Sequence, residues 1–383
     1  MPHLSPRATQ PELFTPVTSI FVVFAAVSIL VLLIPSVRRA RLRRWARDHF
    51  DPARYGLVAR DQLDASRPGP PPPLDLRKET QAVADAAWDG DWHAAAAFVD
   101  AAGTDWDLRW SRLEVLQEIA LHQDAWLGKW RTAQPGNGDA ATVYASVLLH
   151  RAWQVRGTAY ARKVPVGNMT HFKALLPGVM EAAQHAARLA PQDPAPWVVM
   201  VTAARALTYT HEEFHGLWEN LTARAPYHYA GHWQALQYWC EKWHGSHKLM
   251  RDFALRAVRS APAGSPLAGI YLHSLVEYEK AAVGFEKASG SPGVSANRAV
   301  RKILIQVAHC LDQVPETNAE LPRLRHLLAY YLGQGGQFDA ALEQFRLIGP
   351  WCGAAPWTTA SDPVAAFDLA RATAARKSTP TST

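Results

Sequence analysis

The chain has 383 residues, a formal net charge of +6 and 48% hydrophobic residues, against only 19% charged residues. This composition excludes an intrinsically disordered protein. Six arginines and a single acid lie between Arg38 and Asp48, so the rest of the chain is close to neutral. Because the basic residues are packed beside an apolar run rather than spread over a surface, the charge argues against a nucleic-acid-binding protein.

The first predicted element is a transmembrane helix at residues 17–36. Residues 17–34 form an uncharged apolar run, long enough as a helix to cross a bilayer core of roughly 30 Å. A cleaved signal peptide is the alternative. It fits less well, because no basic stretch precedes the run and no small-residue cleavage site follows it. Residues 1–16 are then a short extracytoplasmic tail.

Basic residues that flank the apolar run predict its orientation. Only Arg7 precedes the run, whereas six arginines follow it within a short stretch. The membrane-proximal basic residues are Arg38, Arg39, Arg41, Arg43, Arg44 and Arg47. By the positive-inside rule, we expect a single-pass protein of the inner or plasma membrane, with its N-terminus outside and its C-terminal domain in the cytoplasm. The odd number of cysteines, three, favours a reducing compartment as well.

The sequence predicts three further regions and a tail. Residues 37–64 form a basic juxtamembrane segment, which either only sets the topology or also lies on anionic headgroups. Residues 65–74 are a Pro-rich linker, expected to be an extended and stiff spacer. Residues 75–360 form a helical domain. We expect residues 361–383 to be a C-terminal tail whose last dozen residues are disordered.

Apolar residues recur at helical spacing throughout residues 75–360, so the predicted fold class is all-α. Ala-Pro pairs at 190–191, 225–226 and 261–262 are spaced 35 and 36 residues apart. Each interval holds two helix-sized segments: residues 195–208 and 211–224, then 228–242 and 246–259. A period of this length is typical of an α-solenoid of helical hairpins, in which the proline ends each second helix.

Two segments carry a resemblance to a known family. The spacing Gly336-x-Phe338-x-x-Ala341-x-x-x-Phe345 resembles the turn and second helix of a tetratricopeptide repeat, and Gly90, Trp92, Ala95 and Val99 repeat it. The central units keep the repeat length but lack the glycine, so the repeats are degenerate. The resemblance implies a curved stack of helical hairpins that binds a protein or peptide, and it says more about fold than function.

His211, Glu212 and His215 match the HExxH pattern, in which two histidines bind zinc and the glutamate activates water. Glu219 or Glu241 are the candidates for a third ligand. However, Thr210 and Glu213 also form a capping box, which predicts that the motif begins a repeat helix instead. His228, His232, His244 and His247 lie nearby, but we expect them at opposite ends of antiparallel helices, where they cannot share one ion.

A stretch rich in aromatic residues follows, and Trp239, Trp243 and His244 are its candidate partner-binding residues. The alternative is that these rings fill the core between repeats, with Ser246 capping the next helix. Cys240 and His244 resemble a nucleophile–base pair only superficially, because no orienting acid accompanies them.

The sequence therefore predicts a membrane-anchored cytoplasmic scaffold or adaptor that binds a protein partner. We predict no catalytic residue and no cofactor. A zinc-dependent hydrolase built on the HExxH pattern is one alternative, and a sensor of anionic membrane surfaces is another. The partner's identity and the oligomeric state do not follow from the sequence.

Overall fold

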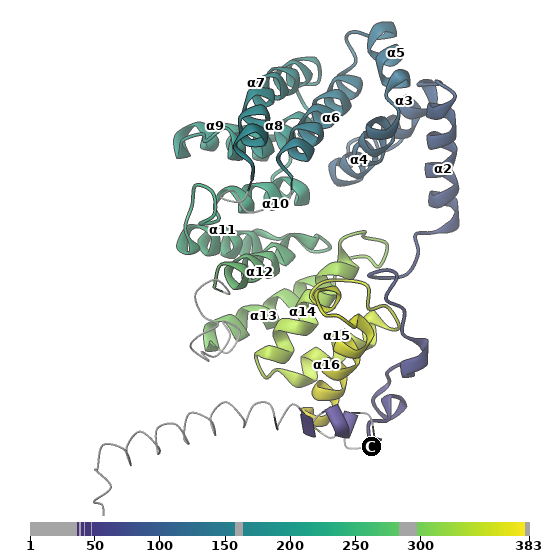
Figure 1. The fold of residues 1–383 in the computed structure, drawn as a ribbon, viewed down its shortest axis with the longest axis vertical. Helices are drawn as coiled ribbons and strands as arrows, with labels where there is room; N and C mark the ends of the chain where they lie inside the picture. Colours follow the sequence, from purple (N-terminus) through teal and green to yellow (C-terminus); the bar gives the residue numbers. More distant parts are fainter. Residues whose placement is uncertain are drawn as a thin grey trace, which may run out of the picture.

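The fold is all-helical, as predicted, throughout the part of the chain that the structure, a computed structural model, describes. This part comprises residues 37, 40, 41, 43–46, 48–157, 164–282 and 297–379. Within these ranges the one β-type pairing is an isolated bridge between Asp64 and Trp351. Figure 1 shows the helices as a tall stack that the chain climbs along one side before it descends through successive helices.

The upper part of the stack contains six helices. They are α2 (Leu74–Trp88), α3 (His93–Asp100), α4 (Trp106–His122), α5 (Ala125–Ala133), α6 (Gly138–Arg156) and α7 (Val166–Leu189). The middle contains α8 (Ala195–Ala206), α9 (His211–Arg224), α10 (Tyr229–Tyr238), α11 (His247–Ser260) and α12 (Ile270–Ala282). The lower part contains α13 (Arg298–Leu311), α14 (Leu321–Gln334), α15 (Phe338–Ile348) and α16 (Pro363–Lys377). Short 3-10 turns lie at Pro52–Tyr55, Arg60–Gln62, Pro266–Gly269 and Trp357–Thr359.

Each helix packs mainly on its neighbours in the chain, as in α6 with α7, α11 with α12, and α14 with α15. The four segments expected from the Ala-Pro period form α8, α9, α10 and α11. The predicted helix caps are confirmed as well. Thr210 and Glu213 make the predicted capping box, and Ser246 accepts a hydrogen bond from Leu249 N as the N-cap of α11.

The two glycine-containing segments form helix–turn–helix units. Gly90 joins α2 to α3 with a φ of 82°, and Gly336 joins α14 to α15 with a φ of 75°; side chains rarely tolerate this left-handed region. Ala95 and Ala341, five residues after each glycine, are fully buried where the two helices of the unit approach. The two turns therefore share one geometry.

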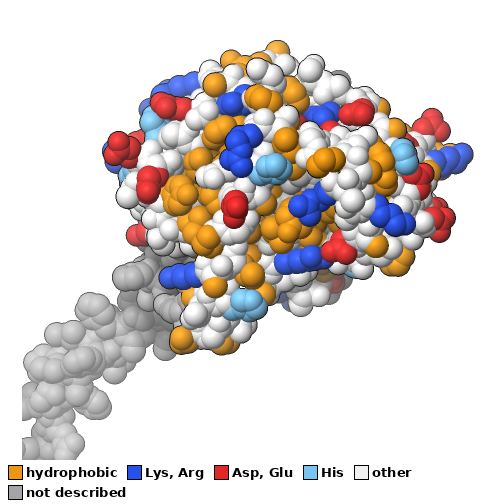
Figure 2. Space-filling view, turned by 90° about the horizontal axis from the view of Figure 1, so that it is seen from above, with side chains coloured by type: hydrophobic (Ala, Val, Ile, Leu, Met, Phe, Trp, Pro, Cys, Tyr) orange, Lys and Arg blue, Asp and Glu red, His pale blue; other side chains and the backbone are white. Residues whose placement is uncertain are grey.

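The core is continuous in the lower and middle parts, and two further clusters fill the upper part. Trp126 and Trp130 are fully buried in α5, as expected for large rings. Figure 2 shows the end of the molecule that carries α5, where hydrophobic side chains are interleaved with both basic and acidic ones. This end of the stack therefore presents no patch of a single charge sign.

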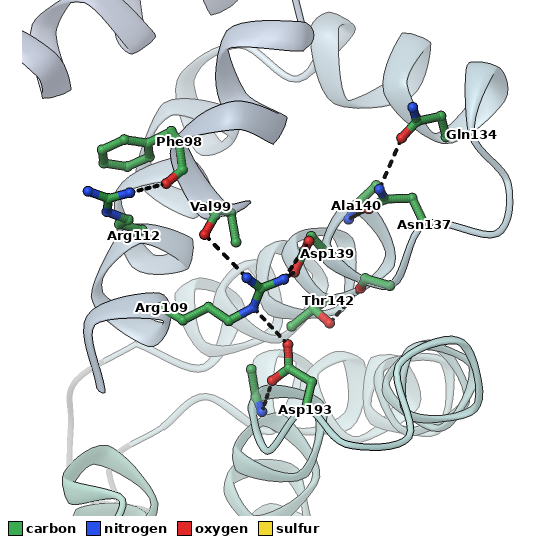
Figure 3. Close-up of polar contacts among 12 residues, drawn as sticks. Phe98, Val99, Arg109, Arg112, Gln134, Asn137, Asp139, Ala140, Thr142 and Asp193 are labelled. Atoms are coloured by element: carbon green, nitrogen blue, oxygen red, sulfur yellow. Dashed lines mark hydrogen bonds and ion pairs between the residues drawn. The ribbon is translucent and has the colours of Figure 1, made fainter. Parts of the chain in front are cut away.

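A buried arginine joins four elements in the upper part (Figure 3). The Arg109 side chain, 14% exposed, donates to both carboxylate oxygens of Asp139, at 2.6 and 2.7 Å, to Asp193 at 3.2 Å and to the Val99 carbonyl at 3.2 Å. Burial raises the pKa of Asp139 to about 6, although Arg109 acts in the opposite direction. Because Asp193 also accepts from Ala195 N at 2.7 Å, the cluster fixes the start of α8.

The Pro-rich residues contain no helix, but they pack on the domain instead of spanning open solvent as expected of a spacer. We call residues 50–73 the docking segment. Asp64 N donates to Pro350 O at 2.8 Å, and Gly353 N donates to Arg67 O at 2.9 Å. Figure 1 shows the N-terminal segment beside the C-terminal helices at the bottom of the stack. These hydrogen bonds use carbonyl groups and the N–H groups of residues other than proline. The prolines of the segment therefore do not prevent them.

The predicted C-terminal tail is also corrected by the structure. Residues 363–377 form α16, whose N-cap Asp362 accepts from Ala365 N. Phe367 and Ala372 are fully buried in this helix, and Arg371 donates to Val58 O at 2.7 Å. The helix therefore belongs to the core because it covers both α15 and the docking segment.

The predicted transmembrane helix, residues 17–36, lies outside the described residues. Among the helices of the described ranges, none is both long and apolar enough to cross a membrane. Of the six membrane-proximal arginines, three are described and exposed: Arg41, Arg43 and Arg44. The other three, Arg38, Arg39 and Arg47, lie outside the described residues.

Candidate functional site

The loop between α10 and α11 carries two of the predicted partner-binding residues, Trp243 and His244. The loop turns back on itself at Gly245, where a Cβ would overlap the carbonyl group of Trp239. Only glycine fits this close approach. Ser246 then begins α11, so the loop is fixed at both ends.

Two histidines hold this loop against neighbouring helices. His211 Nε2 lies 2.7 Å from the His244 carbonyl oxygen, and His244 Nε2 lies 2.7 Å from the Arg205 carbonyl oxygen. Because a carbonyl oxygen can only accept, both Nε2 atoms carry the proton. The contacts tie the loop to the start of α9 and to the end of α8, and this places Trp243 beside the side chain of Arg205.

Two tryptophans and two arginines meet at this point, and we call Trp153, Arg156, Arg205 and Trp243 the Trp–Arg cluster. The two rings stand edge to face, with centroids 5.9 Å apart and an angle of 88°. The Arg205 guanidinium carbon lies 4.8 Å from the Trp153 centroid and 5.2 Å from the Trp243 centroid. For Arg156 the two distances are 5.4 and 5.5 Å. Both cations therefore lie within cation–π range of both rings.

The cluster brings two guanidinium groups close together. The pKa of Arg205 is lowered to about 10, mainly by burial and to a smaller extent by the charge of Arg156, whereas Cys240 and Glu277 act in the opposite direction. The side chain of Arg205 donates to Gln234 Oε1 at 3.3 Å, and no carboxylate of the described residues forms an ion pair with it. Arginine at a half-buried aromatic site is suited to binding carboxylates and phosphates. The arrangement can therefore recognise an anionic group.

A small pocket of about 90 Å³ lies between the α10–α11 loop, α11 and α12. Glu277, with a side chain only 5% exposed, is paired there with Lys242 and with Lys280 at 3.3 Å. Burial acts to raise the pKa of Glu277, but the hydrogen bond and the charge of Lys242 outweigh it, so the pKa lies below its usual value. Glu241 also lines the pocket, so its two lysines are balanced by two glutamates.

Cys240 lines the same pocket but is not an activated nucleophile. Burial raises the pKa of its thiol to about 12, so the thiol stays protonated. The thiol donates to the Leu236 carbonyl at 3.3 Å, whereas the His244 ring is held by Arg205 O. The pairing of Cys240 with His244 that the sequence suggested superficially is therefore not present.

Trp239, the third predicted partner-binding residue, lies on the other side of the loop. Its ring packs edge to face on His211 at 5.0 Å and on Phe214 at 5.6 Å. It therefore supports the loop from the core side. The other three members of the cluster were not predicted from the sequence, and they come from other helices: Trp153, Arg156 and Arg205. Their only local signal was a tryptophan and an arginine three residues apart at the end of α6.

The HExxH residues lie at the exposed start of α9. His211 is held by the His244 carbonyl, and His215 pairs with Glu219 at 3.1 Å, with both side chains more than half exposed. The other proposed ligand, Glu241, pairs with His247 at 2.9 Å. Over the described ranges, no group of three or more His, Cys, Asp or Glu side chains is arranged to hold a metal ion.

The remaining predicted histidines have structural contacts. His228 is the N-cap of α10 and accepts from Gly231 N at 3.1 Å, and His232 Nδ1 lies 2.9 Å from the His228 carbonyl oxygen. Burial lowers the pKa of each to about 4, so both are neutral at pH 7. They lie in the first helix of their hairpin, apart from His211 and His244, as the antiparallel arrangement predicts.

Three carboxyl groups from α4 and the start of α14 influence one another. The pKa of Glu114 is raised to about 7, mainly by burial and to a smaller extent by the charge of Glu320, while a hydrogen bond from Trp110 acts in the opposite direction. Burial also raises the pKa of Asp107 and of Glu320. No pattern in the sequence marks this group, because the two helices are far apart in the chain.

Comparison of the chain with protein-family models, with curated proteins and with solved structures found no match. What the protein does is therefore inferred from the residues and contacts above. Among these, the Trp–Arg cluster is the site with the clearest chemical preference, because cations and aromatic faces together favour an anionic partner.

Proposed function

We propose that this protein is a membrane-anchored cytoplasmic adaptor that binds a protein partner through its helical-repeat domain. The repeats are tetratricopeptide-like hairpins arranged as an α-solenoid. The shared geometry of the Gly90 and Gly336 turns supports this assignment, as does the pairing of α8 with α9 and of α10 with α11. Such stacks present an extended surface for protein binding.

The anchor is the transmembrane helix at residues 17–36, with the N-terminus outside the cytoplasm. The arginines that follow it support this orientation. A test is a fluorescent reporter, folded only in the cytoplasm, fused after Thr383 and in a second version before Met1. We expect fluorescence from the first fusion alone. Fluorescence from the second fusion alone would contradict the orientation.

The partner surface is the Trp–Arg cluster. The observation that carries this proposal is the position of Arg205 over two aromatic rings without a carboxylate partner among the described residues. An acidic segment of a partner would supply the missing anion. Trp and Arg residues provide much of the binding energy in many protein interfaces.

The test is affinity capture of the full chain from detergent-solubilised membranes, with each captured protein quantified by mass spectrometry. We expect a stoichiometric partner with the unaltered chain, its loss with Trp243→Ala, and its retention with Trp243→Phe, which keeps a ring. The matched control is Trp88→Ala, because Trp88 is 58% exposed and lies on α2. Equal recovery with all four chains would contradict the assigned surface.

A further inference from the structure

An open groove with a basic lining lies between α13 and the turn that joins α14 to α15. Its volume is about 390 Å³. The lining residues are Arg298, Arg301, Lys302, Ile305 and Gln337. The three cations are exposed, and the groove is lined by no carboxylate of the described residues.

The nearest acidic side chains in sequence to Gln337 are already engaged. Asp339 accepts from Thr379 N at 2.8 Å and from Thr379 Oγ1 at 3.0 Å, and Glu343 pairs with Arg346 at 2.8 Å. Gln337 donates to the Arg301 carbonyl at 3.0 Å and so links the two walls of the groove. Within the described ranges, none of the three cations forms an ion pair. Their charge is therefore available to a ligand.

The groove is connected to the basic N-terminal segment through a chain of contacts. Phe338 follows Gln337, and Lys377 Nζ lies 4.8 Å from the centroid of its ring. The neighbouring Arg376 lies over the ring of Trp45, with its guanidinium carbon 5.0 Å from the centroid. Trp45 directly follows Arg43 and Arg44, which are exposed. Contacts through α16 therefore link the groove to these arginines.

The N-terminal segment meets α16 at the end of the stack opposite the end that carries α5, and α13, α14 and α15 lie in the same lower part (Figure 1). The α5 end carries side chains of both charge signs (Figure 2). If the apolar run anchors the chain, the bilayer lies next to the lower end. Anionic headgroups on the cytoplasmic leaflet then supply the charge that the groove lacks.

We propose that the groove of Arg298, Arg301 and Lys302 binds the phosphate of an anionic phospholipid headgroup and gives the domain a second contact with the membrane. This inference rests on the membrane anchoring in the proposed function. The groove is wide enough for a headgroup, and Ile305 offers an apolar side to the glycerol backbone. The second contact orients the stack, so that the Trp–Arg cluster lies at a fixed place relative to the bilayer.

Native mass spectrometry of the full chain in detergent tests the proposal. The probes are dioctanoyl phosphatidylglycerol, dioctanoyl phosphatidylcholine and inorganic phosphate. The test variant is Arg298→Gln/Arg301→Gln/Lys302→Gln. The matched control is Lys78→Gln/Arg188→Gln/Arg259→Gln, which removes the same charge from exposed positions elsewhere. Unchanged helical circular dichroism would show that both variants fold.

We expect the anionic lipid to bind the unaltered chain and the control alike, and the test variant to bind on the order of 100-fold more weakly, since each of three cations contributes to headgroup binding. Phosphatidylcholine should bind no better to the unaltered chain than to the test variant. Equal binding of the anionic lipid by both variants would overturn the proposal. So would displacement by inorganic phosphate at equal concentration, which would identify a soluble anion as the ligand. Because binding in detergent needs neither insertion nor a partner, failure here is distinguishable from failure of the adaptor function.

Discussion

Trp357 donates its indole N–H to Nδ1 of His326 at 2.9 Å. The other ring nitrogen of His326, Nε2, lies 2.8 Å from the carbonyl oxygen of Pro68, which can only accept. His326 is therefore a neutral ring with its proton on Nε2, and its side chain is fully buried. Through this one ring, α14 holds both the docking segment and the turn before α16.

The first prediction concerns the pH dependence of this contact. Burial lowers the pKa of His326 to about 4, whereas an unfolded histidine titrates near 6.5. The contribution of His326 to stability is therefore fully present above about pH 6.5 and is lost as the pH falls toward 4. A protonated ring would also direct Nδ1–H at the Trp357 N–H.

The measurement is thermal unfolding of the unaltered chain and of His326→Gln, which does not titrate, across this pH range. We expect the unaltered chain to be more stable by about 1–3 kcal/mol at neutral pH, and the difference to shrink in acid. The comparison is needed because Glu114 and Asp139, with raised pKa values, stabilise the fold as the pH falls. A difference that does not change with pH would contradict the assigned protonation state.

The second prediction concerns the loop that carries Trp243. Gly245→Ala should destabilise the fold by about 2 kcal/mol or more, because the new Cβ would overlap the Trp239 carbonyl. The control is Gly216→Ala in α9, where a Cβ meets no atom within 4 Å. This change should stabilise the helix by up to about 1 kcal/mol. Chemical denaturation measures the free energy of unfolding of both variants. Equal free energies would contradict the close approach of Gly245 to the Trp239 carbonyl.

The third prediction concerns the buried arginine of the upper part. Arg109→Met should cost about 3–5 kcal/mol, because it leaves the carboxylates of Asp139 and Asp193 buried without their cation. Arg151→Met removes an ion pair with Asp124 whose side chains are 44% and 53% exposed, and it should cost less than about 1 kcal/mol. Denaturant unfolding of the two variants measures the contrast. A similar loss in both would show that Arg109 does not join the helices as described.

The fourth prediction concerns the docking segment. The amide of Asp64 should exchange with deuterium much more slowly than in a free Pro-rich spacer, because it donates to the Pro350 carbonyl. Gly353→Ala should speed this exchange, since a Cβ would press on the backbone of Ala65 and Arg67. Hydrogen exchange read by mass spectrometry tests both points. Fast exchange of Asp64 in the unaltered chain would mean that the segment is a free spacer.

Local signals in the sequence predicted the central hairpins well. The Ala-Pro period, the Thr210 capping box and the Ser246 cap depend on residues close together in the chain, and the structure places α8 to α11 accordingly. The start of α16 had a local signal too, since Asp362 and Pro363 are typical of a helix N-terminus, yet the polar last residues suggested a tail.

Long-range contacts were not predictable from the same evidence. The docking segment is held by carbonyl groups such as those of Pro68 and Arg67, and every residue has a carbonyl, so no pattern in the sequence marks the ones that are used. The Trp–Arg cluster likewise joins α6, α8 and the α10–α11 loop. Its members meet only because the hairpins stack, and helical periodicity does not show which ends of different helices face each other.

The most direct test of the adaptor account is site-specific photo-crosslinking in living cells. Gln154 is exposed and lies next to Trp153 in α6, so a photoreactive amino acid at this position would sit beside the Trp–Arg cluster. The control position is the exposed Lys78 on α2. We predict one dominant protein adduct from position 154, lost when Trp243→Ala is added, and none from position 78. No adduct from position 154, or the same adducts from both positions, would contradict the account.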